Sequence, residues 1–246
     1  MNYDQEGLPG VPREVSAATR EHLLSMRAGD PLLWELLTAP SESLAQTALL
    51  VALLSALSAP VLADEARLAA LGLKSLDQRI YLSSFPGKAV TVVGAGGYLE
   101  EALRLPFERV YCCDFNHADA DFAGKVRRRF PQAGEKLVLD DGTRTLELIA
   151  EADIVCLTAS TLCNDSLTAL LPSHPKTVIL EGPSGGVLPG PLFERGVTHL
   201  VHNPVDVDFV ELSKRFSRQE SKGLQSIVSG RFIDIILPEQ RTVLRA

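Results

Sequence analysis

Cysteine pairs with metal-binding spacing are missing from this sequence, and only four cysteines occur among its 246 residues. None forms a Cys-x-x-Cys pair, and three of the four lie in or beside apolar runs; the four are Cys112, Cys113, Cys156 and Cys163. Free, buried thiols in a reducing compartment fit this usage better than a disulfide framework. We also expect no secretory signal, because the first ten residues hold neither a basic stretch nor an apolar core. We therefore expect a cytoplasmic protein.

Basic residues are in deficit: 24 Lys and Arg against 31 Asp and Glu give a net charge of −7. An acidic surface argues against nucleic acid or an anionic membrane as the main partner. The most apolar run, residues 44–63, contains Gln, Thr and Ser, and Pro60 is expected to end a helix there. We expect a core helix from 43 to about 58 and no membrane span.

Chemistry-bearing motifs are also scarce in the first 85 residues of the chain, which have a mostly helical pattern. We expect residues 1–85 to form a smaller helical region that serves as a cap, a lid or a homodimer interface. The boundary is expected at the Ser-Ser-Phe-Pro-Gly stretch, 83–87.

From residue 88 onward, short apolar runs alternate with helical patterns. The runs lie at 88–96, 109–115, 136–141, 152–160 and 176–184, with weaker ones at 198–205 and 231–238. This alternation predicts an α/β fold over residues 86–246: a Rossmann-like parallel (or mixed-edge) sheet with helices on both faces.

Ligands of open α/β sheets bind beyond the carboxyl ends of the strands, so the residues there are the candidate site. The first run ends in a loop with Gly94, Gly96 and Gly97, and the second ends in Asp114 with Asn116 close behind. Glycines let a ligand approach the backbone, and an acid 20 residues after Gly94 is placed to accept hydrogen bonds from a ribose. The same glycines also fit a purely structural turn.

The next three strand ends are polar too, and they complete the candidate ligand-binding set: Asp140 and Asp141, then Thr158, Ser160, Thr161 and Asn164, then Glu181 and Ser184. One of the two adjacent aspartates is placed to accept from an adenine amino group. Asn164, Glu181 and Ser184 are the candidate catalytic residues. Asn164 binds a carboxylate or amine of the ligand or caps the next helix. Glu181 acts as a base, binds an amine or accepts a backbone N–H, and Ser184 donates to the ligand or caps a helix.

The glycine loop favours S-adenosylmethionine over a dinucleotide. Leu99 stands where a dinucleotide loop carries its third glycine, whereas a phosphate-free ligand tolerates a looser loop. Acids at the ends of the second and third strands resemble class I methyltransferases, although Val92 stands where those enzymes carry an acid. The loop and the polar fourth-strand end are similar to nicotianamine-synthase-type enzymes, which use the aminocarboxypropyl arm of the cofactor.

A more specific resemblance covers about residues 85–230. Its motifs are Ala152-Asp153 at a strand start, the turn Thr161-Leu162-Cys163-Asn164, then Gly182-Pro183-Ser184, and finally Phe193-Glu194-Arg195-Gly196-Val197. Together they resemble the putative heavy-metal-chelation family, whose C-terminal domain is Rossmann-like. The resemblance implies metal handling and an N-terminal domain similar to the cap of enolases, whereas residues 1–85 here have a more helical pattern.

The residues themselves assign no metal ligand. His117 and Asp119 follow Asp114, and His199 and His202 are three apart, but no Cys/His set has tetrahedral spacing. A Gly-x-Ser-x-Gly elbow is also missing, which disfavours a hydrolase. A metal stays possible without being favoured.

The leading expectation is an enzyme that uses S-adenosylmethionine as cofactor or substrate, a transferase or a lyase. It transfers a group, or cyclises the aminocarboxypropyl arm with release of a thioadenosine product. The first alternative is a heavy-metal or metallophore-binding protein, and the second is an NAD(P)-linked oxidoreductase.

Overall fold

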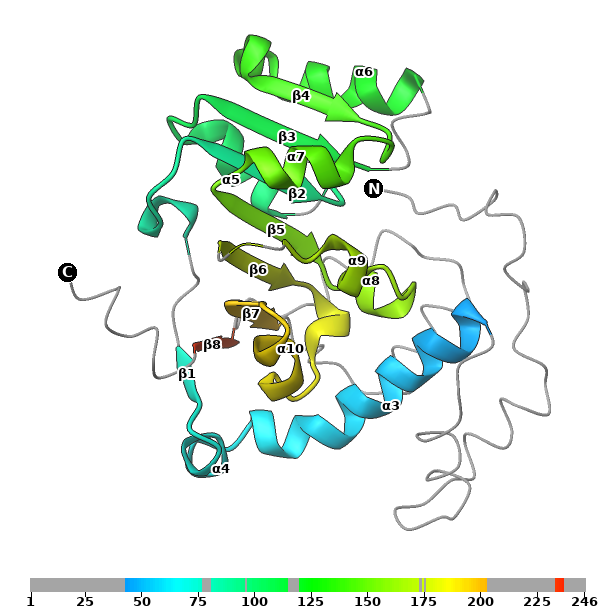
Figure 1. Ribbon diagram of the computed structural model, residues 1–246, viewed down its shortest axis with the longest axis vertical. Coiled ribbons are helices and arrows are strands. Elements are labelled where there is room, and N and C mark those ends of the chain that lie inside the picture. Colours follow the sequence, from blue (N-terminus) through cyan, green and yellow to red (C-terminus); the bar gives the residue numbers. More distant parts are fainter. Residues whose placement is uncertain are drawn as a thin grey trace.

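The computed structural model describes residues 43–76, 81–95, 97–114, 120–172, 174, 176–202 and 233–236. Within these ranges the chain forms one sheet with helices on both faces (Figure 1). Its strands are β1 (Lys74–Leu76), β2 (Ala89–Val93), β3 (Arg109–Cys113), β4 (Leu137–Asp140), β5 (Ile154–Thr158), β6 (Thr177–Glu181), β7 (His199–His202) and β8 (Ile233–Ile236). Every run that the sequence marks as a strand from residue 88 onward is one.

The strand order is β1-β8-β7-β6-β5-β2-β3-β4. Six neighbouring strands in this order are parallel: β7, β6, β5, β2, β3 and β4. β2 lies at their centre, where Val90 pairs with Val110 of β3 on one side and with Ile154 of β5 on the other. β8 runs antiparallel to β7, and β1 runs antiparallel to β8. The six parallel strands have the order of a Rossmann sheet, and the antiparallel pair forms a mixed edge, which confirms the expected fold class.

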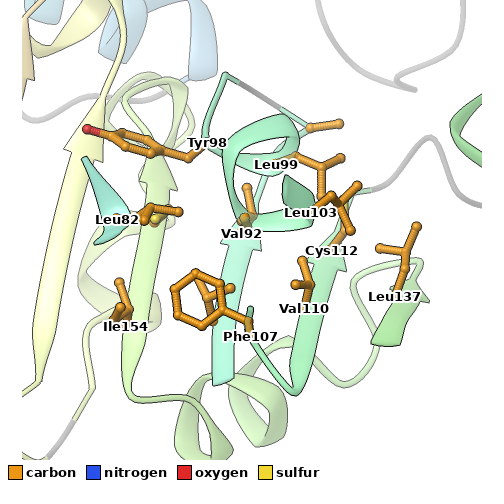
Figure 2. Packing of buried hydrophobic residues seen from close by; sticks show 14 of the residues in the cluster. Leu82, Val92, Tyr98, Leu99, Leu103, Phe107, Val110, Cys112, Leu137 and Ile154 are labelled. Atoms are coloured by element: carbon orange, nitrogen blue, oxygen red, sulfur yellow. The ribbon is translucent and has the colours of Figure 1, made fainter. Parts of the chain in front are cut away.

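One face of the sheet is covered by four elements: η1 (Leu82–Ser84), α5 (Gly97–Arg104), α6 (Ala120–Arg129) and η3 (Pro131–Lys136). Their apolar residues pack on the alternate strand residues that face them, among them Val92, Val110 and Ile154 (Figure 2). Tyr98 and Leu99 of α5 are both buried in this layer. Leu99 therefore fills the space between helix and strand that a third glycine would leave.

The other face carries the remaining helices of the described ranges: α3 (Leu44–Leu62), α4 (Glu65–Ala70), α7 (Thr145–Glu151), α8 (Ser160–Cys163), α9 (Leu167–Leu170), η4 (Pro183–Gly185) and α10 (Gly190–Glu194). Their buried side chains pack on Val155, Leu157, Val178, Leu180 and Leu200 of the sheet. The sequence pattern did not indicate α8 or α10, because each is only about one turn long.

Helix α3 is longer than the sequence suggests. It begins at a Ser43 cap, whose hydroxyl accepts from the Gln46 amide, and it runs through Pro60 to Leu62. The expectation that Pro60 ends the helix is wrong, because the Ala63 amide still donates to the Ala59 carbonyl. Pro60 and the residue one turn before it are exposed, so water can satisfy the carbonyl that the proline cannot reach. No helix in the described part of the chain has the length and apolar character needed to cross a membrane.

The segment before residue 86 is joined to the sheet. β1 pairs with β8 at the sheet edge, and the Ser58 hydroxyl on α3 accepts a hydrogen bond from the Leu188 amide at 3.0 Å. Residues 1–42 lie outside the described residues, so the division into 1–85 and 86–246 stays a prediction.

Candidate functional site

The carboxyl ends of β2 and β5 flank the point where the chain reverses its direction of travel through the sheet. Strands are added toward β3 and β4 on one side of β2 and toward β5, β6 and β7 on the other. The connections that leave β2 and β5 therefore diverge to opposite faces of the sheet, and open α/β sheets bind ligands at such a point. The polar residues at these ends are taken here in spatial order, from β2 outward.

Gly94 makes the turn that follows β2. Its φ of 81° lies in the left-handed region, and its amide donates to the Cys113 carbonyl at 2.8 Å. A Cβ at this position would lie 2.5 Å from Cγ2 of Thr158 at the end of β5. Glycine is thus required both by the backbone conformation and by the close approach of the neighbouring strand.

Asp114 is hydrogen-bonded to Ala95, the next residue of that loop. One of its carboxylate oxygens, Oδ2, accepts a hydrogen bond from the Ala95 amide at 2.9 Å. The Asp114 side chain is half-buried, and its own amide donates to the Asp140 carbonyl. The acid at the end of β3 therefore connects the β2 loop, which leads into α5, to the edge where β3 and β4 end.

The two adjacent aspartates have different environments. Asp140 is buried, and its Oδ1 accepts from the amides of Gly142 and Arg144 at 2.9 and 3.1 Å. Asp141 is exposed, and its Oδ1 accepts from the Thr143 amide at 3.1 Å. Asp140 thus shapes the turn into α7, and Asp141 is the one with its side chain open to solvent.

The threonine-rich turn after β5 is held together mainly by its own hydrogen bonds. The buried Thr161 hydroxyl donates to the Thr158 carbonyl at 2.8 Å. Asn164 is exposed, and its Oδ1 accepts from the amide and the hydroxyl of Ser166. Ser160 is exposed as well, and its Oγ lies 3.4 Å from Oγ1 of Thr158. Thr158 and Ser160 thus place two neighbouring hydroxyls at the carboxyl end of β5.

Glu181 ends β6 directly beside Thr158. The two are register partners, and the Glu181 carbonyl accepts from the Ala159 amide at 2.6 Å. Glu181 is half-buried, and so is Ser184 in the adjoining η4. The structure therefore gathers the polar ends of β5 and β6, as the strand alternation predicts.

Two of the expected site residues, Gly96 and Asn116, lie outside the described residues, as do His117 and Asp119. The remaining ones are distributed along the carboxyl edge from β4 to β6. The sequence did not indicate Ala95, whose amide binds Asp114, because a backbone donor leaves no mark on the side-chain pattern.

The cysteines have the chemistry of core residues. Cys112, Cys113 and Cys156 are buried, and none of the four cysteines forms a disulfide. Burial raises the pKa of the Cys113 thiol to about 11 and raises that of Cys156 well above its usual range. Protonated, buried thiols are poor metal ligands, since the thiolate is the ligating form. This finding confirms the expectation of buried free thiols.

A metal centre does not fit the side chains that the structure describes. No three His, Cys, Asp or Glu residues of the described ranges come together as ligands. His199, one of the three histidines considered for a metal, is buried at the start of β7, against the ring of Phe85. It lies at the amino end of its strand, opposite the candidate site.

Two solved structures have the same fold. A protein with unknown function from the DUF364 family of Pyrococcus horikoshii matches with a TM-score of 0.57 at 20% identity, over 83% of this chain and 74% of that one. A protein with unknown function from the same family of Desulfitobacterium hafniense matches with a TM-score of 0.55 at 17% identity, over 83% and 72% of the two chains.

No curated protein matches this sequence. A family model does match, over residues 78–208, which is more than half of the chain. The matched region contains β2 to β7 and every polar strand end described above. The chain belongs to the DUF364 family, whose description reads "Putative heavy-metal chelation".

Proposed function

We propose that the protein binds an adenosyl-containing small molecule at the carboxyl edge of the sheet, with S-adenosylmethionine as the first candidate. The observation that carries the proposal is the contact between Asp114 and the Ala95 amide. It fixes a carboxylate at the end of β3 beside the loop that leads from β2 into α5. An acid at the end of the second strand of a Rossmann sheet is placed for ribose hydroxyls.

The chain's own residues would hold such a ligand in three ways. A carboxylate has two oxygens and about four acceptor positions, so Asp114 can accept from ribose hydroxyls and from Ala95 together. The tight packing of Gly94 on Thr158 fixes the loop beside the ribose. Asp141, the exposed acid at the end of β4, is within the same row of strand ends and suits an adenine amino group.

S-adenosylmethionine supplies a sulfonium whose attached carbons are open to in-line displacement. The work left to the chain is to position the attacking group behind one of those carbons and to keep water away. Thr158, Ser160 and Glu181 at the ends of β5 and β6 are the groups that would orient the aminocarboxypropyl arm of the ligand. The reaction is a group transfer or a cyclisation of the aminocarboxypropyl arm.

A second candidate function, binding of a metal in complex with a small chelator, is favoured by the family description. The described residues do not form a protein metal site, so the metal's ligands would come from the chelator itself. The chelator's polar groups would then occupy the same strand ends. This candidate differs from the first in requiring a metal for binding.

Calorimetric titration with S-adenosylmethionine, NADH and divalent metal ions, each alone, tests the proposal. We expect heat with S-adenosylmethionine only, and the product mixture to contain methylthioadenosine or S-adenosylhomocysteine, which identifies the bond broken. Asp114→Asn keeps an acceptor for Ala95 and removes the charge, so we expect its affinity to fall by about 1–3 kcal/mol.

The matched control is Asp153→Asn. Asp153 also accepts backbone amides, those of Lys88 and Ala89, but at the opposite edge of the sheet. It should lower stability without changing affinity. The proposal is wrong if wild-type protein gives neither heat nor a thermal shift with S-adenosylmethionine, and heat with a metal ion alone would favour direct chelation.

A further inference from the structure

Thr158 and Glu181 lie side by side on one face of the sheet. They are register partners at the carboxyl ends of β5 and β6. Ile154 and Cys156 of β5 and Ile179 of β6 belong to the core under α5. Because side chains alternate along a strand, Thr158 and Glu181 face that same side. Their polar groups therefore lie at the carboxyl edge of the sheet, on the face that α5 covers.

The packing of Thr158 on Gly94 decides which way its hydroxyl points. A Cβ at Gly94 would lie 2.5 Å from the Thr158 methyl but 3.9 Å from its Oγ1. The methyl thus faces β2, and the hydroxyl is directed away from it. That hydroxyl lies 3.4 Å from Oγ of Ser160, so the two oxygens form a pair at the end of β5.

The Glu181 carboxylate adds a negative charge to these oxygens. It is half-buried, and its charge contributes to the raised pKa of the buried Cys156 thiol, so it lies close to apolar core. Near apolar core the effective dielectric constant is low, so the carboxylate attracts a cation more strongly than it would in open water. An ammonium group has three donors and no acceptor, which matches a carboxylate and two hydroxyl oxygens.

We infer that Glu181, Thr158 and Ser160, here called the Glu181 group, bind a primary ammonium of the ligand. This inference rests on the proposed function, since it assigns the second end of the ligand held at Asp114. Strands β3 and β6 are three strand intervals apart, or about 14 Å. The ligand class is therefore an elongated aminoalkyl nucleoside, with its ribose at β3 and its amine at β6.

The experiment compares two ligands on two proteins. Methylthioadenosine has the nucleoside but no amine-bearing arm, so calorimetry with it and with S-adenosylmethionine separates the two ends. Glu181→Gln is nearly isosteric and removes the charge. We expect it to weaken S-adenosylmethionine roughly 10- to 100-fold and to leave methylthioadenosine unchanged. Asp114→Asn should weaken both ligands.

Glu108→Gln is the matched control, because Glu108 is an exposed glutamate near the amino edge, paired with Lys88. It removes the same charge from the acidic chain away from the site, and neither affinity should change. Equal affinity of wild type and Glu181→Gln for S-adenosylmethionine would overturn the inference and leave the proposed function standing.

A second probe is used if S-adenosylmethionine does not bind wild-type protein, a result that would contradict the proposed function. Thermal shift with 1,4-diaminobutane is then compared with 1,4-butanediol, its neutral counterpart. Stabilisation of wild type by the diamine alone, lost in Glu181→Gln, would support the ammonium site without the nucleoside. The same response in both proteins, or none, would contradict it.

Discussion

At the scale of single residues, His199 was considered as a metal ligand from the sequence, but it has a structural role in the core. Its ring is buried against Phe85, and its Nδ1 lies 2.8 Å from the Thr198 hydroxyl. That hydroxyl already donates its proton to the Val178 carbonyl, so we assign the proton in the His199 contact to Nδ1. The neutral ring is thus a donor within the core and not a metal ligand.

Burial lowers the pKa of His199 from 6.5 to about 4. Between these values the unfolded chain binds a proton that the folded protein does not, so stability is lost as the pH falls from 6.5 to 4. We expect this residue to account for about 3 kcal/mol of that loss. His199→Asn keeps a donor for Thr198 but does not titrate. Urea unfolding at several pH values should show a shallower acid dependence for it than for wild type.

The exposed His174 provides the control, because His174→Asn makes the same substitution at a histidine outside the core. The three proteins contain the same carboxylates, so a shallower slope in His199→Asn alone isolates His199. Identical slopes for His199→Asn and wild type would contradict the assignment.

At the scale of elements, the turn from β2 to α5 depends on Gly94. Alanine there must adopt a φ of 81° and would bring its Cβ to 2.5 Å from the Thr158 methyl. We expect Gly94→Ala to lower the free energy of unfolding by at least about 1–2 kcal/mol. Gly190→Ala should instead raise the free energy of unfolding by about 0.4–1 kcal/mol, because an added Cβ at Gly190 meets nothing within 4 Å. Urea unfolding measures both.

Removal of the Thr158 methyl should recover part of the loss. The double variant Gly94→Ala, Thr158→Ser relieves the overlap and keeps the cost of the positive φ. If Gly94→Ala is as stable as Gly190→Ala, the close contact between β2 and β5 is not present in solution.

The elements themselves were largely predictable from the sequence. Buried parallel strands are continuous apolar runs, so β2 to β7 stood out without any knowledge of their neighbours. β1 did not, because a three-residue strand exists only through its pairing with β8, about 160 residues further along the chain. Pro60 was misjudged because its cost depends on exposure and on its closeness to the helix end, which the sequence does not show.

The candidate site was predictable in position but not in connectivity. The rule that ligands bind at carboxyl strand ends located Asp114, Asp140, Thr158 and Glu181 along one edge. Which acid is buried in a turn and which is open depends on backbone geometry: Asp140 accepts two amides of its own loop, whereas Asp141 is exposed. Residue type alone could not separate them.

At the scale of the whole molecule, the segment before residue 86 contributes to both core layers. Val51, Leu62, Leu68 and Leu73 pack on the face that carries α3, and Leu82 lies under α5 on the other face. The Leu82 amide also donates to the Glu101 carboxylate at 2.5 Å. The helices and the edge strand of this segment are thus part of the same fold as the Rossmann strands.

The boundary predicted near residue 85 can be tested by comparing two fragments, 43–246 and 86–246. Each buried aliphatic side chain contributes about 1.5–3 kcal/mol, and a whole domain is stable by only about 5–15 kcal/mol. Loss of the five buried apolar residues that the structure describes before 86 should therefore leave fragment 86–246 without a cooperative unfolding transition, whereas fragment 43–246 keeps one. Circular dichroism with urea would measure both. Equal midpoints for the two fragments would show instead that the strands from 86 onward fold as a domain of their own.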